Sequence, residues 1–371
     1  MQEFQKGGSK IIQDLIDTAV VNGSRKAIIY GNWEIDKAIR IPSDFELVLD
    51  GCHLIMADNV YDNMFVNYNH LTEFGLTKEG YDKNIKVIGI NHPILDGGNY
   101  NYLSERTHSK DGLPHVTKNI TLYFNNVEGF EVTGLHFHNF RYWALNFEFC
   151  RFGKIHDIHF KANLICEFEG VKFNYFRLDR YNSMIVRQAD GIDIRQGCHD
   201  ILVENIHGIS GDDSVALTNL PVPRGKVEGL SADMYNITVR HIRTATLDAN
   251  VRILGQGGGV IHDVLVEDVY DMSGQLHGIS FGMYGVKLNE IRAYLKGHAT
   301  PEQMYNITIR NIHSRACYCV FYGGYTLNNL VIEDLHPFDG AGLIQDYREE
   351  VLKKEREEKE RLAKEQVEQN K

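Results

Sequence analysis

The sequence lacks the features of several large protein classes. Only seven of its 371 residues are proline and two are tryptophan, and no apolar stretch approaches the roughly 20 residues that a membrane span needs. The N-terminus also lacks the basic and then apolar pattern of a secretory signal. We therefore expect no membrane partner and a cytoplasmic location.

Cysteine is scarce as well, and its spacing matches no metal site. Most of the six residues lie in or beside apolar segments, as buried free thiols do, which fits a reducing compartment. The glycine-rich stretch 255–259 is followed by no Lys-Ser/Thr pair, so it does not indicate a phosphate loop. The sequence gives no reason to expect a cofactor or a metal ion. The cysteines are Cys52, Cys150, Cys166, Cys198, Cys317 and Cys319.

The formal net charge of −11 argues against nucleic acid as a partner. This charge belongs to residues 1–347, because the eight basic and eight acidic residues from Arg348 onward cancel. A negative protein does not attract an anionic polysaccharide over long range. Recognition of such a substrate would have to be local.

A phrase of six to eight residues recurs along the chain and indicates a repeat architecture. Each copy starts with Asn or Asp, as turns often do, and then alternates apolar and polar residues like a half-buried strand. From the copy at Asp200 onward the starts lie 36, 27, 43 and 23 residues apart, which fits a coil of roughly 23 residues with variable loops. The copies begin at Asn119, Asp200, Asn236, Asp263, Asn306 and Asn329.

A second family of short strands lies between these copies, at 144–147, 191–194, 214–217, 250–253 and 278–281. The second and fourth residues of each are apolar and are expected to point inward. The third residues then form an outward column, and the residues just before the strands form another. We predict an all-β fold, a single-stranded parallel β-helix. The outward column is Asn146, Asp193, Ala216, Arg252 and Ser280, and the preceding one is Trp143, Asp190, Asp213, Ala249 and His277.

The two ends of the chain read as helices. Residues 9–22 carry an N-cap serine, Ser9, and an apolar face, followed by Gly23, and this pattern predicts a capping helix over the first coil. Residues 347–371 are almost entirely charged or glutamine and predict a solvated helical or disordered tail. The expected division is a β-helix domain over 1–346 and a tail over 347–371.

Three carboxylates stand just ahead of strands in this stack: Asp190, Asp212 and Asp213. Asp190 and Asp213 are one repeat of 23 residues apart, so they should meet at the strand spacing of about 4.8 Å. Like charges held this close raise each other's proton affinity, so an acid and a base can coexist near neutral pH. Aspartate also caps turns, but three converging acids favour a catalytic site.

The segments Asp190-Gly-Ile-Asp and Gly211-Asp-Asp-Ser resemble family 28 glycoside hydrolases, the polygalacturonase family of right-handed parallel β-helices. The resemblance extends weakly over residues 9–340. It implies inverting hydrolysis of pectin-type chains, with Asp212 as the acid and Asp190 and Asp213 holding the water. The later motifs depart from the family: Ala249 stands where a histidine is expected, and Leu276-His277 stands where Arg-Ile-Lys is expected. On this reading the family's lysine is absent.

Four further residues are candidates for substrate binding. Asp193 either pairs with Arg252 or faces the substrate, and an unpaired Arg252 would clamp a sugar carboxylate or hydroxyl. His277 is either a surface turn residue or part of the site, and Trp143 either stacks on a sugar or anchors the core. Insertions near 164–187 and 220–234 would wall the groove and favour cutting from a chain end.

These features favour a glycoside hydrolase acting on galacturonate- or rhamnose-containing pectic oligosaccharides or polysaccharides. Two other functions stay open. One is a non-catalytic carbohydrate-binding β-helix, and the other is a β-helix lyase or epimerase acting on uronates. The oligomeric state does not follow from the sequence.

Overall fold

The structure is a computed structural model, and it describes residues 3–99, 117–163, 165–168, 171–174, 189–220, 225–255, 259–273, 284–289, 298–315, 317–338 and 340–369. No described helix is both long and apolar to the degree that a membrane span requires.

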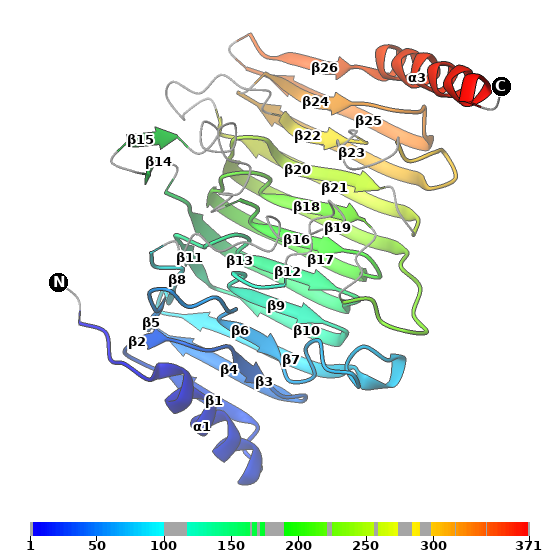
Figure 1. Ribbon diagram of the computed structural model, residues 1–371. Coiled ribbons are helices and arrows are strands. Elements are labelled where there is room, and N and C mark those ends of the chain that lie inside the picture. Colours follow the sequence, from blue (N-terminus) through cyan, green and yellow to red (C-terminus); the bar gives the residue numbers. More distant parts are fainter. Residues whose placement is uncertain are drawn as a thin grey trace.

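Two long parallel sheets form the body of the molecule, and the chain passes from one to the other as it climbs the stack (Figure 1). This is the predicted all-β parallel β-helix. In the first sheet the main path runs β1 (Lys26–Ile29), β4 (Phe45–Asp50), β7 (Asp82–Ile90), β10 (Val127–Thr133), β13 (Arg151–Lys161), β17 (His199–Ile209), β19 (Met234–Ala245), β21 (Ile261–Asp271), β23 (Met304–Ser314) and β25 (Asn328–Pro337). Joined to it are β2 (Asn32–Ile35), β5 (His53–Met56), β8 (Ile94–Asp96) and β11 (His136–His138).

The second sheet carries the candidate site. Its strands are β3 (Ile39–Ile41), β6 (Phe65–Asn67), β9 (Leu122–Asn125), β12 (Leu145–Glu148), β16 (Ile192–Arg195), β18 (Val215–Asn219), β20 (Ala249–Gly255), β22 (Tyr284–Leu288), β24 (Tyr318–Tyr322) and β26 (Gly342–Asp346). Outside both sheets, β14 (Ile165–Phe168) and β15 (Val171–Asn174) form an antiparallel pair, and η1 (Lys78–Gly80) is a short 3-10 turn.

The recurring Asn and Asp residues have a structural reason. Each residue that starts a copy of the phrase has a positive φ, from 50° to 64°, a conformation that Asn and Asp tolerate better than most side chains. Neighbouring copies also bond to one another, because the Asn306 amide donates to Asp263 at 3.0 Å and the Asn329 amide donates to Asn306 at 2.9 Å. The apolar residues that follow pair in register and fill the core, as Ile201, Ile237 and Val264 do.

Four of the five predicted strands of the second family are present, as β12, β16, β18 and β20. The predicted fifth strand, at 278–281, is not the one that continues the sheet. The strand that pairs with β20 is β22, which starts at Tyr284, and residues 278–281 lie outside the described residues. The prediction failed because the repeat does not determine the length of the connection between β21 and β22.

In the second sheet, every residue of the strands from β9 to β22 is buried, on both faces of the sheet. Part of the cover is the loop after β18, which crosses earlier coils. Asn125 donates a side-chain hydrogen bond to the Gly225 carbonyl at 2.9 Å, and the Glu228 amide donates to the Leu76 carbonyl at 2.7 Å. The described part of this loop therefore lies against β9 and β12, where Gly225 is close to Asn125 and Glu148.

The N-terminal end of the stack is covered by α1 (Gly8–Val21), whose Ile12 and Ile16 are fully buried. The sequence had predicted Ser9 as the N-cap of this helix, and that prediction was wrong. The N-cap is Gly7, and the Ser9 hydroxyl instead accepts hydrogen bonds from the backbone amides of Asp36 and Lys37 at 2.9 and 3.0 Å. The serine fastens the helix to the first coil.

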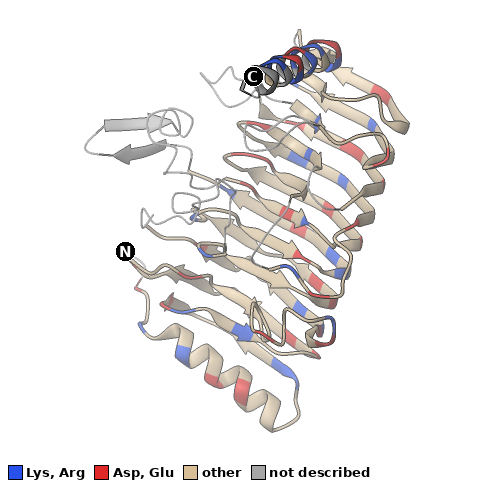
Figure 2. Cartoon of the chain, turned by 45° about the vertical axis from the view of Figure 1, so that its right-hand side comes forward, with Lys and Arg blue, Asp and Glu red and all other residues tan. Residues whose placement is uncertain are grey.

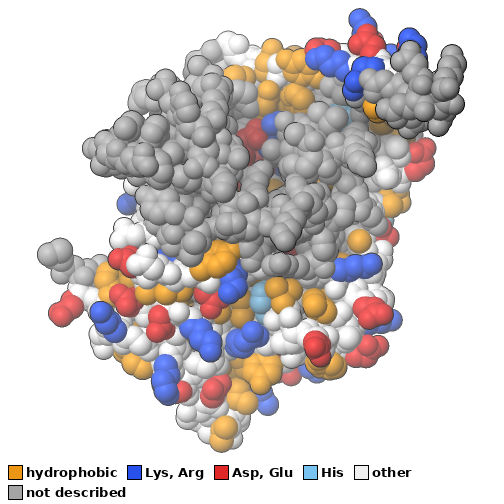
Figure 3. Space-filling model, in the orientation of Figure 1, with side chains coloured by type: hydrophobic (Ala, Val, Ile, Leu, Met, Phe, Trp, Pro, Cys, Tyr) orange, Lys and Arg blue, Asp and Glu red, His pale blue; other side chains and the backbone are white. Residues whose placement is uncertain are grey.

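At the other end, the last strand stops at Asp346 and α3 (Arg348–Gln369) follows it. Acidic and basic residues alternate along this helix (Figure 2), and an example is the ion pair of Lys354 with Glu350 at 2.6 Å. Both signs of charge are also interspersed on the face of the body shown in Figure 3.

The cap supplies a testable prediction of stability. Ile16→Ala should lower the free energy of unfolding by about 2–5 kcal/mol, because it removes a fully buried side chain and leaves a cavity against the first coil. The matched control is Leu15→Ala on the exposed side of the same helix, which should change stability by about 0.5 kcal/mol or less. Chemical denaturation of both variants measures the difference, and equal losses would contradict the capping role.

Candidate active site

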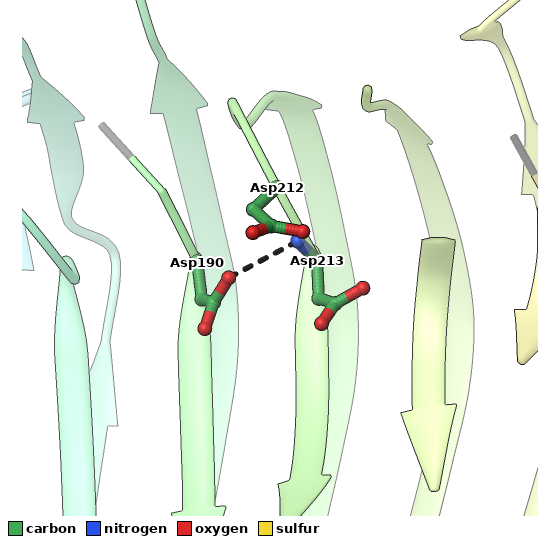
Figure 4. A group of neighbouring side chains, drawn as sticks. All are labelled: Asp190, Asp212 and Asp213. Atoms are coloured by element: carbon green, nitrogen blue, oxygen red, sulfur yellow. Dashed lines mark hydrogen bonds between the residues drawn. The ribbon is translucent and has the colours of Figure 1, made fainter. Parts of the chain in front are cut away.

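Asp190, Asp212 and Asp213 converge at the ends of two neighbouring coils (Figure 4). Asp190 enters β16, and Asp212 and Asp213 enter β18, the strand beside it. One carboxylate oxygen from each residue lies within 4.8 Å of the others. The backbone amide of Asp213 also donates a hydrogen bond to Asp190 Oδ1 at 3.2 Å. The predicted meeting of these acids at one strand spacing is what the structure shows.

The backbone around the three acids is tied down on several sides. The Asp212 amide donates to the Ala189 carbonyl at 2.9 Å, and the Thr246 hydroxyl donates to the Asp212 carbonyl. Gly191 is required by packing, because a Cβ at this position would lie 2.5 Å from the Ser214 carbonyl oxygen. The Asp-Gly and Gly-Asp-Asp segments therefore hold the carboxylates in fixed positions.

Arg252 lies next to the acids and connects them to a fourth carboxylate. Its Nε is 2.6 Å from Asp213 Oδ2, its Nη2 is 4.0 Å from Asp212 Oδ1, and it donates a hydrogen bond to Asp248. Within the described residues, Arg252 forms ion pairs with Asp212, Asp213 and Asp248. The alternative in which Asp193 pairs with Arg252 is therefore not the arrangement found. Asp193 lies two coils away, because Ala216 stands between the two residues in the column.

Lys287 extends this network and was missed in the sequence. Strand pairing places it beside Arg252, and its Nζ lies 2.8 Å from Asp248 Oδ1. The position that follows Ala249 in the other column is Tyr284, where the sequence had predicted His277. His277 lies outside the described residues. The expectation that a lysine is absent from this site was wrong. The alternation of Tyr284-Gly-Val-Lys-Leu was the signal that could have revealed it.

The charges around Asp248 favour its ionised form. Burial alone would raise the pKa of Asp248, but Arg252, Lys287 and a hydrogen bond with Asp212 outweigh burial and lower this pKa below its ordinary value. Asp248 is thus an anion that lies between the two cations beside the acid cluster.

The acids on the other side of the cluster are held closer to their neutral forms. Burial raises the pKa of Asp190 well above its ordinary value, and the charges of Asp193 and Asp212 raise it further. Burial likewise raises the pKa of Asp193, which forms a hydrogen bond with Asp190. Burial also raises the pKa of Asp213, but Arg252 opposes this shift. Asp213 is thus the acid of this group with a cation in direct contact.

A second buried network lies on the N-terminal side of the acids. The Arg195 guanidinium lies over the Trp143 ring, 4.9 Å from its centroid, and its Nε is 3.4 Å from Glu148 Oε1. The Tyr123 hydroxyl donates to the other Glu148 oxygen at 2.5 Å. The sequence had singled out only Trp143 from this group. The others sit in outward positions of β9, β12 and β16, and a charged residue inside an otherwise apolar strand was the available signal.

The acid cluster lines a pocket on the outer face of the second sheet, together with Trp143 and Arg195. It offers about 50 Å³ to the centres of water-sized spheres, and one water molecule needs only about 10–15 Å³ by this measure. The pocket therefore has room for ordered water beside the acids. Four carboxylic acids and two arginines are among its described lining residues: Asp190, Asp193, Asp212, Asp213, Arg195 and Arg252.

Comparison with known proteins extends the fold assignment. The sequence matches no protein-family model and no curated protein. Solved structures do match. An exopolygalacturonase from Thermotoga maritima is 15% identical with a TM-score of 0.56, and the alignment covers 92% of this chain and 77% of that chain.

Two other solved structures show the range of proteins with this fold. A 1,3-α-1,4-β-D-galactose-4-sulfate-3,6-anhydro-D-galactose-2-sulfate 4-galactohydrolase is 10% identical with a TM-score of 0.55, covering 91% of this chain and 86% of that chain. The surface adhesin PfbA of Streptococcus pneumoniae is 10% identical with a TM-score of 0.51, covering 91% and 95%. At these identities the likeness establishes the parallel β-helix fold, which carbohydrate-active enzymes share.

The raised pKa of Asp193 predicts a pH-dependent effect on stability. Above about pH 4 an unfolded aspartate loses its proton, but the folded protein retains it, so folding becomes less favourable as the pH rises toward the folded-state pKa. Asp193→Asn removes this loss. The variant should therefore gain thermal stability relative to the wild type between pH 4 and pH 8.

Melting temperatures across this range test the effect. Asp17→Asn on the exposed side of α1 is the control, and it should show no such trend. A constant difference between Asp193→Asn and the wild type at all pH values would contradict the assignment.

Proposed function

We propose that the protein is a glycoside hydrolase that cleaves pectin-type oligosaccharides or polysaccharides containing galacturonate or rhamnose. One observation carries the proposal: carboxyl oxygens of Asp190, Asp212 and Asp213 lie within 4.8 Å of one another, and Asp213 is paired with an arginine. Hydrolysis of a glycosidic bond needs a carboxylic acid that donates a proton and a carboxylate near the same bond.

In the proposed reaction Asp212 donates its proton to the leaving oxygen as the bond to the anomeric carbon breaks. Its side chain is 25% exposed, whereas that of Asp213 is 3% exposed, so Asp212 is the acid that can reach a substrate in the groove. Asp190 and Asp213 hold a water molecule, and Asp213 takes a proton from it as the water attacks the anomeric carbon. Arg252 opposes the rise in the pKa of Asp213 that burial causes, and so favours the ionised form that acts as the base.

The spacing of the acids bears on the stereochemistry. Carboxyl groups are typically about 6.5–9.5 Å apart in inverting enzymes and about 5–5.5 Å apart in retaining enzymes. The 4.8 Å limit applies to one oxygen from each carboxyl group, and the carboxyl carbons can lie farther apart than these oxygens. We propose inversion, as the resemblance implies. NMR of the first product decides the point, because the opposite anomer would indicate a covalent intermediate on a carboxylate.

Arg252 and Lys287 are the proposed binding groups for an acidic sugar. Lys287 supplies a lysine beside Arg252, where the sequence had suggested that the family's lysine is absent. Trp143 and Asp193 are proposed to contact the substrate from the pocket wall, and His277 keeps its proposed role without a described position. The loop 225–233 lies over the earlier coils, and we propose that it closes the substrate groove on that side, which would favour action from a chain end.

The known structures support a carbohydrate ligand. The T. maritima neighbour is an exopolygalacturonase, and a tailspike mutant of E. coli bacteriophage HK620, with a TM-score of 0.54 and 12% identity, is in complex with a pentasaccharide. The alignment covers 91% of this chain and 61% of the tailspike chain. The adhesin PfbA supports the second candidate, a non-catalytic binding protein, because a surface adhesin has the same fold.

Replacing the proposed acid tests catalysis directly. Asp212→Asn keeps the shape of the side chain but cannot supply the proton, so turnover should fall by about 10²–10⁴-fold with an unchanged melting curve. Release of reducing sugar from a panel of pectic oligosaccharides, with and without chelator, is the measurement. Wild-type activity that the chelator abolishes would favour the lyase or epimerase, and no activity on any member would favour the binding protein.

Replacing Lys287 tests the binding of an acidic sugar. Lys287→Met should raise KM for a galacturonate substrate about tenfold, because a charge-assisted hydrogen bond is lost. The KM for the methyl-esterified form of the same substrate should change much less. The control is Lys154→Met on the outer face of the first sheet, where the lysine is 43% exposed. Equal effects of Lys287→Met on both substrate forms would contradict the clamp.

A further inference from the structure

We propose that the C-terminal end of the stack, formed by the free edges of β25 and β26, binds a second copy of this chain. The two copies meet through the same end and form a closed dimer with two-fold symmetry. This inference concerns the assembly of the protein and is independent of the proposed reaction.

The core side chains of the last coil lack a neighbour on one side. Ile344 pairs with Val320 of the preceding coil, yet Ile344 is 40% exposed and Val320 is fully buried. The core residues of β25 likewise pair with fully buried isoleucines of β23 but are themselves only partly buried. A further coil at this end would complete their burial. The residues of β25 concerned are Leu330, Ile332 and Leu335.

The backbone at this end also lacks a partner strand within the described residues. β25 ends the strand order of the first sheet and β26 ends that of the second, so each presents a row of N–H and C=O groups (Figure 1). Edges of this kind pair readily with another chain. Apolar side chains lie beside them, since Leu343 is 53% exposed and Phe338 is 37% exposed. Figure 3 shows hydrophobic side chains at this end of the body.

The shape of this end specifies the partner. A complementary surface has two strand edges at the same separation with an apolar cross-section between them, which is the open end of another β-helix. The opposite end of this chain does not offer such a surface, because α1 covers the first coil with Ile12 and Ile16 fully buried. Copies therefore cannot add head to tail into a filament, and the contact closes at two chains.

The size of the end suits a stable contact. β25 has ten residues, which span about 33 Å, and the two packed sheets are together about 20 Å thick. The end thus presents roughly 650 Å² in each copy. Stable interfaces bury about 600–1,000 Å² on each partner, so the end alone falls in that range before any contact of α3 is counted.

The charges beside the end permit this contact. A two-fold axis brings a surface against its own copy, so a surface of one sign would repel itself. α3 starts beside β26 and carries both signs along its length (Figure 2), and the eight basic and eight acidic residues from Arg348 onward cancel. The carboxylate of Asp346, at the end of β26, is paired with Arg348 at 2.5 Å. The two helices therefore add no net repulsion to the contact.

The oligomeric state in solution tests the proposal. In reducing buffer, light scattering and sedimentation equilibrium should give the wild type a mass of twice the 42.4 kDa chain. Ile344→Lys should weaken association at least tenfold, because it places a charge in the contact. The matched control is Ile90→Lys in β7, within the strand order of the first sheet, where the side chain is 43% exposed. This variant should remain a dimer.

Hydrogen exchange of the wild type at several concentrations locates the contact without any substitution. Amides of β25 and β26 should exchange about tenfold more slowly where the dimer forms than after dilution. Amides of β1 and β3, at the opposite end of the two sheets, should exchange at the same rate at all concentrations.

Three outcomes would overturn the proposal. The first is a wild type that is monomeric at every concentration, and the second is an assembly of more than two chains, because the contact would then not close. The third is a dimer that persists in Ile344→Lys with unchanged exchange in β25 and β26, since the copies would then meet elsewhere. None of these results bears on hydrolysis by the acid cluster.

Discussion

Parallel backbone pairing between successive coils is the constraint on which the rest of this structure depends. It holds neighbouring strands about 4.8 Å apart, so residues at equivalent positions become neighbours whatever their separation in sequence. Core residues such as Ile201 and Ile237 stack in this way, and so do Asp190 and Asp213. The same regularity that fills the core with aliphatic side chains brings like charges together on the outer face.

Buried like charges cost free energy unless cations or protons offset them. In this protein both kinds of compensation are present. Arg252 pairs with Asp213 and Asp248, Lys287 pairs with Asp248, and the raised pKa values of Asp190, Asp193 and Asp213 favour the uptake of protons. A site this crowded with acids thus favours protonated carboxyl groups, which the proposed chemistry uses.

Periodicity in the sequence predicted the features that depend on local pattern. The alternation of apolar residues and the repeated Asn or Asp starts fixed the strands, and the 23-residue spacing of Asp190 and Asp213 predicted their meeting. Lys287 was not predicted because the repeat does not determine the length of the connection between β21 and β22. Residues 278–281 were therefore assigned to the strand that is formed by Tyr284–Leu288. Ion-pair partners such as Asp248 depend on side-chain reach and cannot be read from the repeat. The Ser9 contact with Asp36 likewise joins two elements that the sequence does not align.

The loop that follows β18 changes how the stack behaves as a whole. In an ideal solenoid each coil interacts only with its neighbours, so stability is a sum of local terms and unfolding can begin at either end independently. The bonds from Gly225 to Asn125 and from Glu228 to Leu76 join coils that are 100 or more residues apart in sequence. They add long-range coupling to a nearest-neighbour system. Fraying of the earlier coils should therefore loosen this loop as well, and the two should open as one cooperative unit.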